Sequence, residues 1–307
     1  MQEPQQRPPR QPLVAPGQIE HYVPDLTVTA AGDVTLAALQ EKLAENDQWL
    51  PIDGDPQLAL SRLVETNSSG PLRLGFGAWR DLLLGVQFTT PADKFITVGA
   101  RTMKNVAGYD VTKLMVGQHG LFGKIDTVTT RSYKLPDGAI LATFPPIIEK
   151  IATLLTTPAR PQWAMATDGQ IYCGYLGDER TLDFYQSCLA DYGATSLQRQ
   201  SLKQDIEFRN RHWLGNRKPT VFRASVPPAR VLQFMSMISN ATSAADPIFG
   251  IVVGSISSSS ESEAIDRATA HLGGTVVYGD PDKIRSFLGA SPDRLQLLER
   301  LQSAFNE

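Results

Sequence analysis

The chain has 307 residues with an ordinary globular composition, 42% hydrophobic and 20% charged, and at this length two domains are expected. Its formal net charge of −3 excludes the strongly basic character of proteins that bind nucleic acid or acidic membranes. Two cysteines, Cys173 and Cys188, and four scattered histidines lack the spacing of zinc or iron–sulfur sites. Only two cysteines in a chain of this size favour a reducing compartment.

The chain starts with "MQEPQQRPPRQPLVAPGQ", which is rich in proline and glutamine and has no apolar core of the kind found in secretory signals. Such a segment cannot bury enough apolar surface to fold, so residues 1–18 are predicted to be a disordered tail. No stretch of the sequence is long and apolar enough to predict a membrane span. We therefore expect a cytoplasmic protein whose ordered part begins at Ile19.

Residues 19–137 predict an α+β domain of short strands and helices. Thr35 is expected to cap a helix that carries Leu36, Leu39 and Leu43 along one face. The other predicted elements are strands over 26–30, 84–89, 94–100 and 124–135 and helices over 58–65 and 110–116.

Proline and glycine interrupt the pattern near residue 136, which predicts a second domain over residues 138–307. Helices are predicted over 147–155, 181–192, 229–239 and 261–272, and strands over 163–167, 171–176, 220–225, 248–253 and 275–278. This alternation around a small sheet is typical of a ferredoxin-like α+β sandwich.

Two glycine-rich segments, residues 67–77 and 108–123, carry the functional signal. Neither matches a P-loop, a G-x-G-x-x-G turn, a nucleophile elbow or an H-E-x-x-H zinc pair. Glycine is needed where φ is positive or where another group approaches the main chain closely. Two interpretations are open: the segments line a flat or phosphorylated ligand, or they are turns between short elements.

The segment "RTMKNVAGYDVTKLMVGQHGLFGKIDTVTTRSYKLP" resembles one found in FAD-binding proteins of the vanillyl-alcohol oxidase (PCMH) type, and "ETNSSGPLRLGFGAWRDLLLGVQF" resembles the segment before it. Within that family the chain is most similar to the smaller FAD-binding subunit of bacterial glycolate oxidases. The likeness covers about residues 25–136 and resumes weakly at "FRNRHWLGNRKPTVFRASVPP". It implies an α+β fold with a PCMH-type FAD-binding domain, its N-terminal subdomain truncated, followed by a ferredoxin-like cap domain.

The resemblance implies that FAD lies against main chain in two loops and beside one strand. The predicted cofactor-binding residues are Thr66, Asn67, Ser68, Ser69, Gly70, Gly75, Gly117, Gly120, Gly123 and Ile125. Asn105 and Asp110 are expected to brace a loop and cap a helix, and Tyr109 to pack in the core or against the cofactor. No metal site and no catalytic side chain are predicted.

The implied activity is that of an FAD-dependent oxidoreductase subunit in a glycolate oxidase-like complex that oxidises a small 2-hydroxy acid. The implied partners are a larger flavoprotein subunit, which would oxidise the substrate, and an iron–sulfur subunit, which would accept electrons. The substrate, the electron acceptor and the stoichiometry are left open.

The chain departs from the family pattern in three places. The pattern begins at "DLTVTA", beyond the position of the family's glycine-rich pyrophosphate loop. Ser61-Arg62 replaces a Gly-Gly pair, so that the arginine either fills that space or pairs with a phosphate. Leu121 lies where a hydroxyl would help, with His119 close to it. These departures keep an alternative open: a degenerate, non-catalytic homologue that acts as a scaffold or interaction subunit.

A basic cluster follows in the second domain, formed by Arg209, Arg211, His212 and Arg217. It is interpreted as a solvated or interface surface. An alternative is that it attracts a carboxylate substrate.

Overall fold

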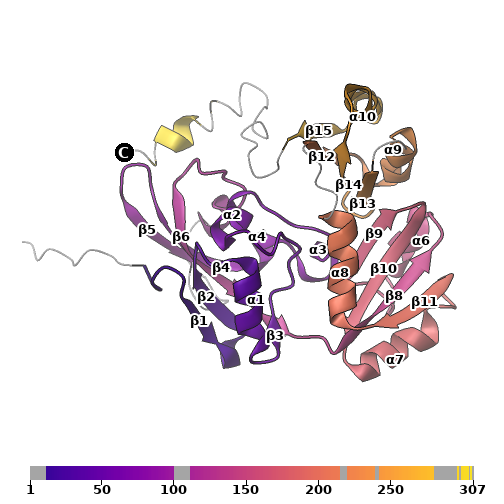
Figure 1. The fold of residues 1–307 in the computed structure, drawn as a ribbon, viewed down its shortest axis with the longest axis horizontal. Coiled ribbons are helices and arrows are strands. Elements are labelled where there is room, and N and C mark those ends of the chain that lie inside the picture. Colours follow the sequence, from indigo (N-terminus) through magenta and orange to yellow (C-terminus); the bar gives the residue numbers. More distant parts are fainter. Residues whose placement is uncertain are drawn as a thin grey trace, which may run out of the picture.

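The computed structural model describes residues 12–99, 111–214, 220–238, 242–279, 296, 299–303 and 305. It contains two large antiparallel sheets that lie side by side, with helix α8 (Leu202–Trp213) between them (Figure 1). Asn105, Tyr109, Asp110 and Arg217, which the sequence analysis singled out, lie outside the described residues. In the described part of the chain, no helix has the length and apolar character needed to cross a membrane.

The first sheet has five strands in the order β1-β2-β6-β4-β5. They are β1 (Ile19–Tyr22), β2 (Thr27–Ala31), β4 (Leu83–Thr89), β5 (Phe95–Gly99) and β6 (Lys124–Arg131). The same half of the chain contains η1 (Val23–Asp25), α1 (Leu36–Ala44), α2 (Leu60–Glu65), α3 (Arg73–Phe76), α4 (Trp79–Leu82) and α5 (Val111–Leu114). A small ladder pairs β3 (Gln48–Trp49) with β7 (Tyr133–Lys134). The predicted strands are confirmed, and the one expected over 124–135 is interrupted at Ser132.

Helix α1 forms as its local sequence predicts. The Thr35 hydroxyl accepts a hydrogen bond from the amide of Ala38 at 3.2 Å, which confirms the predicted N-cap. Leu36, Leu39 and Leu43 are all buried in the hydrophobic core that packs on the first sheet, which we call the first core. Burying a leucine side chain stabilises a fold by about 1.5–3 kcal/mol, so this apolar face fixes α1 on the sheet.

The second sheet has eight strands in the order β11-β8-β10-β9-β13-β14-β12-β15. They are β8 (Gly138–Phe144), β9 (Trp163–Thr167), β10 (Gln170–Gly177), β11 (Ser196–Gln200), β12 (Thr220–Ser225), β13 (Thr242–Asp246), β14 (Ile251–Ile256) and β15 (Thr275–Tyr278). Its other helices are α6 (Ile148–Leu154), α7 (Glu179–Cys188), η2 (Pro228–Arg230), α9 (Val231–Met237) and α10 (Ser259–His271). The α+β prediction is confirmed, although α8, β8, β11 and β13 were not predicted.

The two faces of the second sheet are covered by different parts of the chain. Helices α6, α7, α9 and α10 share one buried cluster with Ile140 and Ala142 of β8. Leu141, between them, belongs to a cluster on the opposite face that includes Trp49 and Leu72 of the first domain. Successive strand residues point to opposite faces, so β8 is apolar at every position except Thr143 because it is buried on both sides. The first domain therefore packs on the sheet face that α8 also covers.

Both ends of the described chain contact the first core. Residues 1–11 lie outside the description, but Val14 is 3% exposed and packs in that core. The prediction of a disordered tail is thus wrong for residues 12–18, because Val14 supplies apolar surface that the proline-rich composition obscures. Phe305 also returns to this core, with its ring centroid 4.9 Å from that of Phe122.

Candidate functional site

The two glycine-rich segments lie against each other in the structure. We call residues 66–72 the first loop and residues 117–123 the second loop. The amides of Gly117 and His119 donate to main-chain carbonyls at the end of α2, at 2.9 and 3.0 Å. The side chain of Asn67 is 3.5 Å from the position that a Cβ on Gly117 would take. The two predicted groups of residues are thus joined directly.

Left-handed backbone recurs where the loops meet. The φ angles of Asn67, Gly117, His119 and Gly120 are 50°, 78°, 51° and 80°. Within the described part of the chain, no atom beyond its two neighbours in sequence lies within 4 Å of the position of a Cβ on Gly120, which is exposed. The glycine at 120 is therefore required by its backbone angle and not by packing, and the space beside it is open to a ligand.

The amides of the first loop complete α2. Those of Thr66, Asn67 and Ser68 donate to carbonyls of the helix at 2.9–3.0 Å, as C-terminal capping requires. The Thr66 hydroxyl donates to the Arg62 carbonyl at 2.8 Å. The groups that this part of the loop can offer to a ligand are consequently side chains, above all the exposed Asn67 and the half-buried Ser68.

Three of the predicted glycines are explained by close packing within the protein. A Cβ on Gly70 would lie 2.6 Å from the side chain of Asp53. A Cβ on Gly75 would lie 2.8 Å from main chain of the second domain. A Cβ on Gly123 would lie 2.2 Å from the carbonyl oxygen of Thr89. These glycines shape the loops, whereas Gly117 and Gly120 face more open space.

Ile125, predicted to place main chain beside the cofactor, is buried, and its backbone hydrogen-bonds to the Glu65 carboxylate. Burial raises the pKa of Glu65, while Arg62 and this hydrogen bond act against the rise. A protein carboxylate therefore already engages the main chain of Ile125, and a bound nucleotide would have to lie beside it or displace it.

Arg62 brings positive charge to the junction of the two loops. Its guanidinium lies 3.7 Å from the Glu65 carboxylate, and its side chain is 34% exposed. Burial lowers the pKa of His119, and the nearby Arg62 charge lowers it further, so the imidazole is neutral at neutral pH. Arg62 thus stands where an anionic group between the loops would meet it.

The second loop is braced by Gln118, a residue that the sequence analysis did not single out. Its buried side-chain amide donates to the Gly123 carbonyl and accepts from the Phe122 amide, both at 2.9 Å. These two bonds close the loop from within. The available signal was a glutamine flanked by loop glycines in "GQHG".

Helix α8 corrects the interpretation of the basic cluster. Arg209 is 2% exposed and forms ion pairs with the buried carboxylates of Asp53 and Asp205. Arg211 is exposed, in agreement with a solvated surface, and His212 lies 3.7 Å from Asp168. Arg209 differs because the helix turns it toward the first domain, where two carboxylates offset the cost of burying its charge.

Burial shifts the pKa values of Asp205 and Arg209 in opposite directions. It raises the pKa of Asp205 to about 7, and the hydrogen bonds from Trp163 and Gln200 act against the rise. It lowers the pKa of Arg209 to about 9, so the guanidinium stays protonated at neutral pH.

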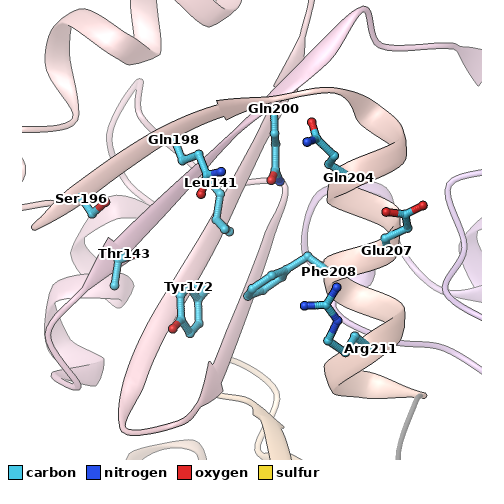
Figure 2. Close-up of a pocket in the computed structure, with 10 residues that line it drawn as sticks. All are labelled: Leu141, Thr143, Tyr172, Ser196, Gln198, Gln200, Gln204, Glu207, Phe208 and Arg211. Carbon is cyan, nitrogen blue, oxygen red and sulfur yellow. The ribbon is translucent and has the colours of Figure 1, made fainter.

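A groove lies on the other side of α8 (Figure 2). Its volume is about 420 Å³, which suits a small ligand. It is lined by Leu141, Thr143, Tyr172, Ser196, Gln198, Gln200, Gln204, Glu207, Phe208 and Arg211. The rings of Tyr172 and Phe208 point toward each other, with centroids 5.0 Å apart. The groove contains none of the predicted cofactor-binding residues.

Comparison with known proteins identifies relatives that match part of the chain. No family model matches the sequence. The mitochondrial D-lactate dehydrogenase [cytochrome] of Arabidopsis thaliana is 29% identical over 121 residues, which are 39% of this chain and 21% of that protein. Glycolate oxidase subunit GlcE of Escherichia coli is 31% identical over 126 residues, or 40% of this chain and 36% of that protein. The matches thus span no more than 36% of either curated relative.

The fold has a counterpart among solved structures. An alkyldihydroxyacetonephosphate synthase superposes with a TM-score of 0.62 at 12% identity, over 92% of this chain and 62% of that chain. At this identity the match supports the fold and not the activity. The PCMH-type fold and the resemblance to FAD-linked oxidoreductases, both predicted from the sequence, are confirmed.

Proposed function

We propose that this chain, whose relatives are FAD-linked oxidoreductases of the glycolate oxidase and D-lactate dehydrogenase kind, is an FAD-binding oxidoreductase subunit. The observation that carries the proposal is the junction of the first and second loops. There the amides of Gly117 and His119 bond to the end of α2, and open space lies beside Gly120. The stretch of sequence that forms this junction also belongs to the segments that resemble the FAD-binding family.

We infer that the residues at this junction hold an elongated nucleotide. The side chains of Asn67 and Ser68 and the main chain of Gly117 and Gly120 would hold FAD, and Arg62 would offset the charge of its pyrophosphate. Bound FAD supplies the electron acceptor for oxidation of an alcohol carbon. The protein's own part is to bind and orient the flavin nucleotide.

The proposed reaction is the oxidation of a small 2-hydroxy acid within a multi-subunit assembly in the cytoplasm. Two relatives are named glycolate oxidase subunits, one from Escherichia coli and one from Bacillus subtilis. A larger flavoprotein subunit and an iron–sulfur subunit are the proposed partners. The alternative, a scaffold without cofactor, is supported by Glu65, whose carboxylate already engages the Ile125 main chain.

Titration of the purified chain with FAD separates these two functions. We expect the visible absorption bands of bound flavin, or quenching of FAD fluorescence as the apoprotein is added. Arg62→Gly tests the role of the arginine: weaker binding indicates that it holds the pyrophosphate, and tighter binding indicates that it obstructs the site. A colourless protein that does not respond to FAD would contradict the proposal and support the scaffold.

A further inference from the structure

A buried series of polar contacts attaches the first loop to the second domain. Asp53 lies before α2, and its Oδ2 accepts a hydrogen bond from the amide of Leu72 at 2.7 Å. Its Oδ1 pairs with Nη1 of Arg209, and Nε of the same arginine lies 3.0 Å from Asp205. Each of these three charged side chains is at most 3% exposed.

A second contact from the same helix reaches the same loop. The indole Nε1 of Trp213 donates to the carbonyl of Ser69 at 3.3 Å. A Cβ on Gly70 would lie 2.6 Å from Asp53 and 2.9 Å from Trp213. The loop is therefore held between these two side chains, and it has a glycine at the point where they approach it most closely.

At its other end, this series of contacts reaches the second sheet through Asp205. Asp205 accepts hydrogen bonds from the indole of Trp163 at 3.0 Å and from the amide of Gln200 at 3.4 Å. Trp163 is fully buried and Gln200 is partly buried. The Nε of Arg209 is thus held by Asp205 and its partners, which all belong to the second domain. Its Nη1 pairs with Asp53 of the first domain.

We propose that Arg209 is a positioning residue for the nucleotide: through Asp53, it holds the first loop in the conformation that binds FAD. The inference rests on the proposed function for the cofactor, but the ordering of the loop can be measured without one. It assigns to the second domain a part in forming a site whose predicted residues all lie in the first domain.

Arg209 can hold the loop because a buried carboxylate without a positively charged partner is unfavourable in free energy. With Arg209 in place, Asp53 offers one oxygen to the guanidinium and the other to the Leu72 amide. Without the guanidinium, the buried side chain of Asp53 loses its positively charged partner, and this loss weakens its hold on the loop. Asn67 and Ser68 would keep the bonds of their amides to α2, but the part of the loop that follows them, residues 69–72, would lose its fixed position toward the nucleotide.

The experiment compares Arg209→Met and Asp53→Asn with Arg209→Lys, which keeps the charge. Arg211→Met is the matched control, because it removes an exposed arginine from the same helix. Leu182→Ala is the stability control, because it opens a cavity under α7 on the opposite face of the sheet. For each full-length protein, amide hydrogen exchange of the first loop is measured without FAD, and the FAD dissociation constant is measured separately.

We expect faster amide exchange in the first loop and about tenfold weaker FAD binding for Arg209→Met, the lower end of the range seen at metal sites when a residue that holds a metal ligand in place is removed. Arg209→Lys should restore part of both effects, and the two controls should leave both unchanged. Unchanged exchange in Arg209→Met overturns the inference, and so does faster exchange with undiminished FAD binding. If the wild type binds no FAD, the proposed function fails, and the exchange data alone decide whether Arg209 orders the loop.

Discussion

The two loops of the candidate site are held in place in different ways. The second loop is closed by its own side chain, Gln118, which bonds to residues four and five positions along the chain. The first loop is held by Trp213 and, through Asp53, by Arg209, and these contacts span 144 and 156 positions. The second loop therefore has a support of its own in addition to its bonds to α2, whereas residues 69–72 of the first loop depend on the docking of a second domain.

The largest effect is expected where the long-range support is removed. Arg209→Ala leaves two buried carboxylates without their guanidinium, and we expect a loss of about 3–5 kcal/mol in the free energy of unfolding. Denaturant titration measures this loss, with Arg211→Ala as the control at about 0.5 kcal/mol or less. A similar loss in both variants would show that the buried ion pairs of Arg209 do not explain the effect.

Removal of the local support should cost less stability but still affect the site. Gln118→Leu leaves the Gly123 carbonyl and the Phe122 amide without a partner, at an expected cost of about 1–3 kcal/mol. Gln40→Leu is a matched control, because Gln40 makes the same pair of bonds to Leu50 at 2.7 and 3.0 Å.

Both glutamine variants should lose stability in thermal denaturation, and Gln118→Leu alone should weaken FAD binding. Equal FAD affinities in the two variants would show that the second loop does not contribute to the site.

A smaller and more local change tests the open space beside the second loop. Gly120→Ala and Gly169→Ala both introduce a Cβ at positive φ, 80° and 72°, with no atom within 4 Å. Each should cost about 1–2 kcal/mol of stability through backbone strain. In FAD titrations Gly120→Ala should bind more weakly than Gly169→Ala, and equal binding would place the nucleotide elsewhere.

The smallest expected effect is a pH dependence from His119. Its pKa is lowered below the ordinary 6.5 by burial and by Arg62, so the unfolded chain binds the proton more readily than the folded one. This contribution to stability is present above pH 6.5 and is lost as the pH falls through the folded-state pKa. Melting temperatures measured from about pH 8 to pH 5 should therefore fall more steeply for the wild type than for His119→Gln. Parallel curves would contradict this assignment.

Helix α8 shows why part of the site escaped prediction. Its start has a local signal, a capping box in which Ser201 accepts from the Gln204 amide and Gln204 accepts from the Ser201 amide, at 3.3 and 2.9 Å. Its most deeply buried residues, however, are Asp205 and Arg209. Hydrophobic periodicity cannot detect a helix whose inward positions are charged, so the segment was interpreted as a basic surface.

What the sequence determined by itself was local or carried by family motifs: the Thr35 cap, the leucine face of α1, strands β2, β4, β5 and β6 of the first sheet and the two glycine-rich loops. These features depend on propensity and on spacing over a few residues, which a sequence displays directly. The tertiary structure alone decided that Arg209 reaches Asp53 and that Glu65 engages the main chain of Ile125. A charged side chain can lie in water or in a buried pair, and the energy that selects between them arises only when distant segments meet and exclude water.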